Sequence, residues 1–253
     1  MNGMIIYRGT SVIDGKPIVV IATGLQTGGN NSKTGAMVQV YILRSDIDPW
    51  AAVHTGEDAS ICGGCKHRGR IVPSDRPGFE TRNVERSCYV VLMHGPRMVY
   101  NAFRNNAYPE VPLSVARQKL RGLKVRVGAY GDPGAVPMAV WDEALDRADL
   151  VNSYTHLWRE RPELSAFCMA SCDTEEEREA AKALGFRTFR VRPKDAAKLS
   201  GEGLCPASAE MSKAVRCASC MLCGGRRTGA RADITIQVHG TGAGHFTRAA
   251  ALA

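Results

Sequence analysis

Seven of the nine cysteines in this 253-residue chain fall into two groups whose spacing suits metal ligands. The C-terminal set is made up of Cys205, Cys217, Cys220 and Cys223. The N-terminal set is made up of Cys62, Cys65 and Cys88. Four thiolates can complete the coordination of a zinc ion or an iron–sulfur cluster, whereas three leave one position for another ligand. The pattern therefore predicts one closed metal site and one open site, and chemistry is expected at the open one.

The spacing within the C-terminal set favours a [4Fe–4S] cluster. Three of its cysteines are separated by two residues each, and the distant Cys205 is followed by Pro206. Such a tight run lets successive thiolates wrap around one face of the cluster. Zinc remains an alternative, because four thiolates also suit a tetrahedral structural site, and His239 would serve in a Cys3His site.

The N-terminal set allows two kinds of metal site, and its cysteines could also be buried or incidental thiols that bind no metal. Its three thiolates suit a [4Fe–4S] cluster whose fourth iron binds a substrate or S-adenosylmethionine. They equally suit a zinc ion, with His67, His94 or Cys168 as the fourth ligand. The two cysteines outside the sets, Cys168 and Cys172, flank the end of an expected strand, and we expect them to pack in the interior.

Three polar residues lie where expected strands end: Asp132, His156 and Asp173. In parallel α/β sheets, ligands bind at the carboxyl ends of the strands. We therefore predict that these three side chains line the substrate pocket and transfer protons there. Each also has a structural alternative, as a turn former, a core histidine and a helix N-cap, respectively.

Short apolar segments alternate with helical ones along most of the chain, which predicts an α/β protein with a parallel sheet. Expected strands cover residues 18–22, 37–43, 89–93, 124–129, 151–156, 167–171, 186–191 and 233–238. Expected helices cover residues 96–105, 113–123, 137–148 and 174–184. This succession fits a partial or complete (β/α) barrel, or else an open doubly wound sheet.

We expect the chain to have two parts. Residues 1–200 form the barrel-like domain, with the N-terminal set in a glycine- and arginine-rich loop over residues 50–88. Residues 201–253 form a cysteine-rich, metal-binding segment and a closing strand. The first part would carry the pocket, and the second would carry the closed metal site.

Charge and composition indicate which kinds of partner and which cellular compartment to expect. The formal net charge is +8, and basic residues are concentrated in residues 117–126, 187–198 and 226–231. Such stretches favour a nucleic acid or a nucleotide as the partner. No signal peptide and no apolar run of membrane-spanning length is evident, so we expect a cytoplasmic protein without membrane contact. In that compartment, Cys-x-x-Cys spacings favour metal over disulfides.

Together, these motifs give the chain a resemblance to a family of phage and prophage proteins. The shared motifs, spread from about residue 32 to residue 240, are Cys62-x-x-Cys65, Cys88-Tyr89, Gly131-Asp132, Tyr154-Thr155, Ala170-Ser171-Cys172-Asp173, the C-terminal set and His239-Gly240. That family looks like the radical S-adenosylmethionine enzymes. The resemblance implies a partial (β/α) barrel, an open cluster on the N-terminal set, S-adenosylmethionine binding and the cytoplasm of a bacterial host. Radical enzymes of the usual kind hold three cysteines in one short loop, whereas Cys88 lies 23 positions after Cys65.

The leading expectation is a phage-type iron–sulfur metalloenzyme that modifies a nucleic acid or a nucleotide. The chain is also similar to the tRNA-guanine transglycosylases and their phage DNA-modifying relatives, which are (β/α) barrels with a zinc site near the C-terminus. That resemblance implies a base-exchange enzyme with structural zinc, in which Asp132 or Asp173 is the nucleophile. A third alternative is a zinc-stabilised nucleic-acid-binding protein without catalytic activity.

Overall fold

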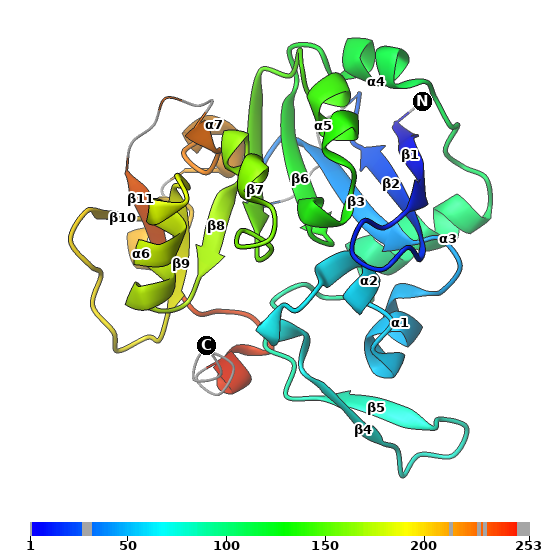
Figure 1. Ribbon diagram of the computed structural model, residues 1–253, viewed down its shortest axis with the longest axis horizontal. Coiled ribbons are helices and arrows are strands. Elements are labelled where there is room, and N and C mark those ends of the chain that lie inside the picture. Colours follow the sequence, from blue (N-terminus) through cyan, green and yellow to red (C-terminus); the bar gives the residue numbers. More distant parts are fainter. Residues whose placement is uncertain (1, 27–31, 213–214, 227–228, 230–231, 247–253) are drawn as a thin grey trace.

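The computed structural model describes residues 2–26, 32–212, 215–226, 229 and 232–246. One large sheet contains β1 Gly3–Thr10, β2 Pro17–Thr23, β3 Val38–Arg44, β6 Lys124–Tyr130, β7 Leu150–Thr155, β8 Met169–Cys172, β9 Thr188–Arg192, β10 Glu202–Leu204 and β11 Asp233–Gln237 (Figure 1). A separate hairpin contains β4 Arg70–Pro73 and β5 Thr81–Val84. The helices are α1 Pro49–Thr55, α2 Ala59–Cys62, α3 Gly95–Arg104, α4 Leu113–Leu120, α5 Met138–Ala144, α6 Glu175–Ala183 and α7 Cys217–Cys220. No helix of the described ranges is long and apolar enough to cross a membrane.

The large sheet is mostly parallel, which confirms the predicted α/β class. Its strand order is β1-β2-β3-β6-β7-β8-β9-β11-β10. The pairs β1–β2 and β2–β3 are antiparallel, and every pairing from β3 onward is parallel. From β3 to β9, each strand lies beside the next strand of this sheet along the chain. The strands β1 and β10 form the two edges, so the strands described here make an open sheet and do not complete a barrel.

The helices α4, α5 and α6 lie on one face of the sheet. The helices α5 and α6 both lie in front of it in Figure 1, and α6 packs against β8 and β9 while α4 packs against α5. Val125 and Val127 of β6 belong to the main hydrophobic core, together with Leu120 of α4 and Trp141 of α5. Successive side chains of a strand point to opposite faces, so Arg126 points away from this core. On the opposite face α3 packs against β3, and the part of that face over β6 to β9 is available for a site.

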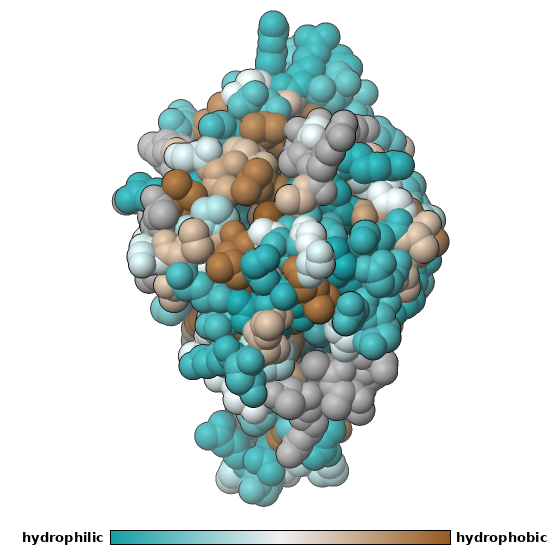
Figure 2. Space-filling model, turned by 90° about the vertical axis from the view of Figure 1, so that its left-hand side faces the viewer, coloured by the Kyte–Doolittle hydropathy of each residue, from teal (hydrophilic) through white to brown (hydrophobic). Residues whose placement is uncertain are grey.

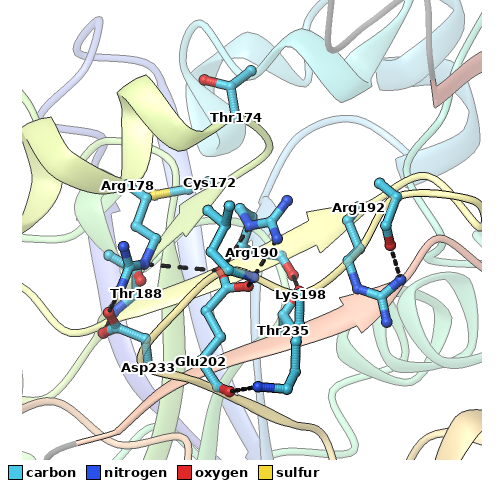
Figure 3. A network of polar contacts seen from close by, with 12 residues as sticks. Cys172, Thr174, Arg178, Thr188, Arg190, Arg192, Lys198, Glu202, Asp233 and Thr235 are labelled. Carbon is cyan, nitrogen blue, oxygen red and sulfur yellow. Dashed lines mark hydrogen bonds and ion pairs between the residues drawn. The ribbon is translucent and has the colours of Figure 1, made fainter.

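A buried network of polar side chains lies beside β9, β10 and β11 (Figure 3), next to a small apolar cluster that includes Ile234 and Ile236 of β11. The guanidinium of Arg190 forms a two-pronged ion pair with Glu202, with N–O distances of 2.6 and 2.8 Å. Arg178 of α6 lies 2.9 Å from a carboxylate oxygen of Asp233 on β11. These side chains are buried, so their charges depend on one another for the solvation that water would otherwise supply.

This network corrects the interpretation of residues 187–198 as a surface for nucleic acid. Arg187, Arg190 and Arg192 are each less than a tenth exposed. Arg187 donates hydrogen bonds to the carbonyl oxygens of Gly224 and Ala232, at 2.6 and 2.5 Å. These arginines are internal, so they cannot form a basic outer patch. Of residues 226–231, only 226 and 229 are among the described residues.

The strand predicted over residues 89–93 is not formed. The guanidinium of Arg86 donates to the carbonyl oxygens of Cys88 and Val90, both at 3.0 Å, and so occupies acceptors that a neighbouring strand would use. Tyr89 is 45% exposed. The segment therefore runs as an irregular connection into α3.

The surface on the β10 side is mixed in character. Seen from that side, apolar side chains occur in small groups near the middle, and hydrophilic side chains cover both ends (Figure 2). The segment between β10 and β11 contributes three large apolar residues that are 36–40% exposed, Met211, Val215 and Leu222. Neither apolar nor hydrophilic side chains dominate this side of the surface.

Candidate functional site

All seven cysteines of the two sets line one cavity. Its volume is about 190 Å³, which is room for on the order of a dozen water molecules. The N-terminal set comes from the connection between β3 and α3, and the C-terminal set comes from the segment between β10 and β11. All nine cysteines are free thiols. The two sets are far apart in the sequence, and the structure brings them to a single space.

The sheet face opposite α5 and α6 forms the floor of this cavity. Alternate residues of four neighbouring strands line it, namely Arg126, Gly128 and Tyr130 on β6, Asn152 and Tyr154 on β7, Ser171 on β8, and Phe189 and Val191 on β9. The residues between them point the other way, as Val125 and Val127 do. The site is thus built on the sheet itself, with the cysteine segments placed over it.

Two backbone hydrogen bonds bring the N-terminal set together. Cys62 ends α2, and Cys65 immediately precedes the short turn that contains His67. The carbonyl oxygen of His67 accepts hydrogen bonds from the amides of Ser87 and Cys88, at 3.2 and 3.1 Å. These two hydrogen bonds join the ends of the segment that contains the β4–β5 hairpin. They bring Cys88 into the electrostatic range of Cys65 although 22 residues separate them in the chain.

Burial dominates the chemistry of these thiols. It raises the pKa of Cys62 well above its ordinary value and the pKa of Cys65 to about 12. The carboxylates of Asp58 and Asp132 raise the pKa of Cys62 further. Such thiols keep their protons at neutral pH unless a cation replaces them. A bound metal would supply that cation and convert the thiols to thiolates.

Each part of the C-terminal set is tied to a different element. The amide of Cys205 donates to a carbonyl of β11 at 2.9 Å, and the amide of Cys217 donates to the carbonyl of Lys33, between β2 and β3, at 3.2 Å. The carbonyl of Cys223 accepts an amide of β7 at 3.1 Å. Burial raises the pKa of Cys223 to about 12. Burial also raises the pKa of Cys217, against the opposing charges of Arg126 and Lys33.

The donor atoms do not gather around a single point. Within the described part of the chain, no three histidine, cysteine, aspartate or glutamate side chains are grouped so as to hold one metal ion. A tetrahedral zinc site needs its thiolates about 2.3 Å from one ion. In a four-iron cluster each thiolate binds a different iron, so the donors surround a cube. The identity of the metal stays a prediction.

Asp132 follows β6 and is held by three donors. Its Oδ1 accepts hydrogen bonds from the amide of Gly134 and the hydroxyl of Thr155, both at 2.8 Å, and its Oδ2 accepts one from the amide of His156 at 2.7 Å. The side chain is buried and borders the cavity. Burial raises its pKa, although these hydrogen bonds favour the charged form. Asp132 therefore fixes the turn after β6 and the end of β7.

His156 follows β7 and borders the same cavity. Its Nε2 is buried and has no hydrogen-bond partner among the described residues. The centroid of its ring lies 5.5 Å from that of His67, in an edge-to-face arrangement. An imidazole nitrogen in this situation can bond a ligand. Of the three predicted catalytic residues, His156 is the best placed for proton transfer.

Asp173 follows β8, so the three predicted residues do end three neighbouring parallel strands. Asp173 is not among the described residues that line the cavity. Its Oδ2 lies 2.7 Å from Nε2 of His67 and 3.0 Å from Nζ of Lys66, and Nδ1 of His67 lies 2.7 Å from the hydroxyl of Ser87. The N-cap of α6 is Thr174, so the predicted N-cap role of Asp173 is wrong. Asp173 anchors the loop of the N-terminal set to the end of β8.

We expect Asp173→Asn to loosen that loop. The substitution removes the charge that pairs with Lys66 and leaves His67 a weaker partner, so local opening of residues 62–88 should become easier by about 1–3 kcal/mol. Hydrogen exchange followed by mass spectrometry should show faster exchange there and no change over residues 113–145. Asp149→Asn, at an exposed position, is the matched control. Unchanged exchange over residues 62–88 would contradict the anchoring role.

The other candidate metal ligands differ in whether they border the cavity. His67 and His239 border the cavity, so both remain compatible with a mixed cysteine–histidine site. His94 lies at the start of α3 and is not among the described residues that line the cavity. Cys168 and Cys172 are fully buried in the main core, as expected of packed thiols.

Sequence reasoning missed three residues of the cavity wall: Lys33, Tyr89 and Arg126. The sequence places Arg126 in the basic stretch 117–126, which we expected on the outer surface. Its signal was the alternation of the strand, since an arginine between Val125 and Val127 must point to the other face. Lys33 and Tyr89 carry no comparable local signal, because only the tertiary fold brings them to β6.

The chain matches no known family model, and no curated protein or solved structure matches it significantly. The class of protein is therefore defined by the fold and the site themselves. The chain is a mixed α/β protein with an open, mostly parallel sheet. Its distinguishing feature is the single cavity bordered by seven free cysteines.

Proposed function

We propose that this protein is an iron–sulfur enzyme that modifies a nucleic acid or a nucleotide. The observation that carries this proposal is the meeting of both cysteine sets in one cavity, beside Asp132 and His156. A purely structural metal site has no need of a cavity with an unpartnered imidazole nitrogen in its wall. An enzyme needs both a metal centre and room for a substrate.

The donor chemistry of the two sets supports iron–sulfur binding. Thiol groups are soft donors that suit iron–sulfur clusters, and each set consists of thiols whose charges act on one another. The C-terminal set would hold a closed cluster, and the N-terminal set would hold an open one that leaves a position for a substrate or S-adenosylmethionine. When bound, such clusters supply electron transfer.

The residues of the chain itself have distinct tasks in this proposal. Asp132 holds the amide of His156, so it orients the residue whose Nε2 borders the cavity. His156 would accept or donate a proton at that nitrogen when a substrate lies in the cavity. Asp173 acts at a distance, by holding His67 and with it the loop of the N-terminal set.

The strand order supports a partial (β/α) barrel as the architecture of this enzyme. From β3 to β9 the strands follow the order of the chain, without the reversal that marks a doubly wound sheet. The helices α5 and α6 lie on one face, and the cavity lies on the other. In a barrel, the same arrangement places helices outside and ligands inside.

The transglycosylase alternative receives less support from the geometry. A nucleophilic aspartate needs a carboxylate oxygen that can attack a substrate. Both oxygens of Asp132 accept hydrogen bonds from the protein. Asp173 is not among the described residues that line the cavity, and its carboxylate pairs with His67 and Lys66. Neither side chain presents an oxygen to the cavity in the way that base exchange requires.

Metal analysis of the anaerobically purified and reconstituted protein tests the proposal. Two four-iron clusters would give about eight iron and eight sulfide per chain, with visible absorbance that bleaches on reduction. Reduced protein should then be assayed for cleavage of S-adenosylmethionine. Zinc without iron or sulfide would overturn the proposal, and it would favour the transglycosylase or the non-enzymatic nucleic-acid-binding protein.

A further inference from the structure

Charged groups of both signs border the cavity, but those that act on the C-terminal set are basic. Asp58 and Asp132 act on the N-terminal set, where their charges raise the pKa of Cys62. Lys33 and Arg126 act on the C-terminal set, where their charges oppose the effect of burial on Cys217. Arg68 and Arg86 also act on the N-terminal set, so the charge there is mixed. The cavity has a basic side next to the C-terminal set, and an anionic group is favoured there.

Arg126 is the centre of the basic side. It points from β6 into the cavity, and its Nη2 donates to the hydroxyl of Tyr89 at 2.8 Å. Among the described residues, its guanidinium forms no ion pair with a carboxylate. An arginine carries five N–H donors in a planar fork that matches the oxygens of a phosphate. Most of that donor capacity remains for a ligand.

Two aromatic rings lie beside this guanidinium. The ring of Tyr89 stacks on the ring of His239, with centroids 5.8 Å apart and an interplanar angle of 25°. Nε2 of His239 in turn lies 3.1 Å from Nζ of Lys33. Tyr89 is 45% exposed, so part of its ring is open to a ligand. Exposed aromatic rings next to cations are the means by which proteins stack nucleobases and hold their phosphates.

This group also lies between the two cysteine sets. Tyr89 directly follows Cys88 in the chain, and the carbonyl of Lys33 accepts the amide of Cys217. A ligand held here is flanked by the N-terminal set on one side and by the C-terminal set on the other.

We propose that Arg126, Tyr89, His239 and Lys33 form a nucleotide subsite. Arg126 and Lys33 bind a phosphate, and the base stacks on Tyr89. The assignment rests on the proposed function for its substrate class, but the subsite itself needs no cluster. The phosphate belongs either to a free nucleotide or to a single strand of nucleic acid, because both present the same chemistry to a guanidinium.

Binding measurements with matched ligands test this subsite. The probes are the four common ribonucleoside 5′-monophosphates, their nucleosides and a short 5′-phosphorylated single-stranded oligonucleotide, titrated calorimetrically into the full chain. A monophosphate should bind more tightly than its nucleoside. Arg126→Gln should weaken the binding of the monophosphate by about ten- to a hundredfold and leave the binding of the nucleoside unchanged. Tyr89→Leu should weaken both ligands by about tenfold.

The controls separate a ligand role from a structural one. Arg126→Lys keeps the charge but loses the fork, so it should fall between the wild type and Arg126→Gln. Arg147→Gln removes an exposed arginine outside the cavity and should bind as the wild type does. If the oligonucleotide binds more tightly than the monophosphate, a strand is the natural source of the phosphate. If it does not, the source is a free nucleotide.

Two results would overturn the subsite. One is equal binding of monophosphate and nucleoside by the wild type. The other is unchanged monophosphate binding by a folded Arg126→Gln variant, especially if its iron content falls, because the guanidinium would then serve only the cysteines. Iron and sulfide are measured on the same samples, so nucleotide binding without iron refutes the cluster and leaves the subsite intact.

Discussion

Cys223→Ser is expected to remove the iron held by the C-terminal set and to lower the stability of the whole protein. A group bound at a thousandfold above its Kd contributes about 4 kcal/mol to the free energy of unfolding, and loss of the cluster should cost about that amount. The carbonyl of Cys223 also holds β7, so the metal would stabilise the sheet directly. Iron and sulfide analysis and chemical denaturation of the reconstituted protein measure both effects.

Two further variants complete this test. Cys62→Ser should remove only the iron of the N-terminal set, with a smaller loss of stability, because its loop lies outside the large sheet. Cys168→Ser is the matched control, since its thiol is buried in the main core beside the hydroxyl of Ser153, 3.2 Å away. It should keep all iron. Loss of iron from the control, or full iron in Cys223→Ser, would show that the sets do not bind the clusters.

Glu202→Ala is expected to destabilise the protein by about 3–5 kcal/mol, because it leaves a buried arginine without its counter-charge. The carboxylate of Glu202 accepts two hydrogen bonds from Arg190 and one from the amide of Leu199 at 2.8 Å. Glu110→Ala is the control, because its partner Arg8 and Glu110 itself are about half exposed. That variant should cost no more than about 1 kcal/mol. Equal losses in the two variants would contradict the internal role of Arg190.

The same ion pair predicts a dependence on pH. Burial alone would raise the pKa of Glu202, but the hydrogen bond and charge of Arg190 hold it below its ordinary value of 4.5. A depressed carboxylate pKa contributes stability above the ordinary value, and that stability is lost as the pH falls through the lower, folded value. Between pH 5 and acid unfolding, the wild type should therefore lose more stability than Glu202→Gln. Parallel curves for the two proteins would argue against the ion pair.

Much of the parallel sheet could be predicted from local pattern. The apolar, β-branched stretches at β2, β3, β6, β7 and β11 lie in the structure within a few residues of their expected places. β2 and β3 are buried on both faces and show nearly continuous hydrophobicity, whereas apolar and polar residues alternate in β6. Because the strands were placed well, Asp132, His156 and Asp173 were correctly expected at the ends of neighbouring strands.

The parts that could not be predicted depend on distant partners. The strand β10 has only three residues, Glu202 to Leu204, and exists because β11 pairs with it. The sequence predicts Asp173 as the N-cap of α6, but Thr174 can cap the helix equally well and does so. The partner of Asp173 is His67, and no local sequence pattern predicts that contact. The meeting of the two cysteine sets also could not be predicted from local pattern, because the sheet between them brings them together.

The position of β11 between β9 and β10 sets an order on the folding of the chain during synthesis. β10 leaves the ribosome first, but its only neighbour in the sheet, β11, is made about thirty residues later, which takes seconds at a rate of about 5–20 residues per second. Until then the edge of β9 that will pair with β11 has no partner, and the amide of Cys205 lacks the β11 carbonyl to which it donates in the folded protein. The C-terminal set therefore cannot complete its contacts with the sheet before β11 has been made. If the set binds a metal as proposed, the finished site is available to that metal only after this strand has been translated.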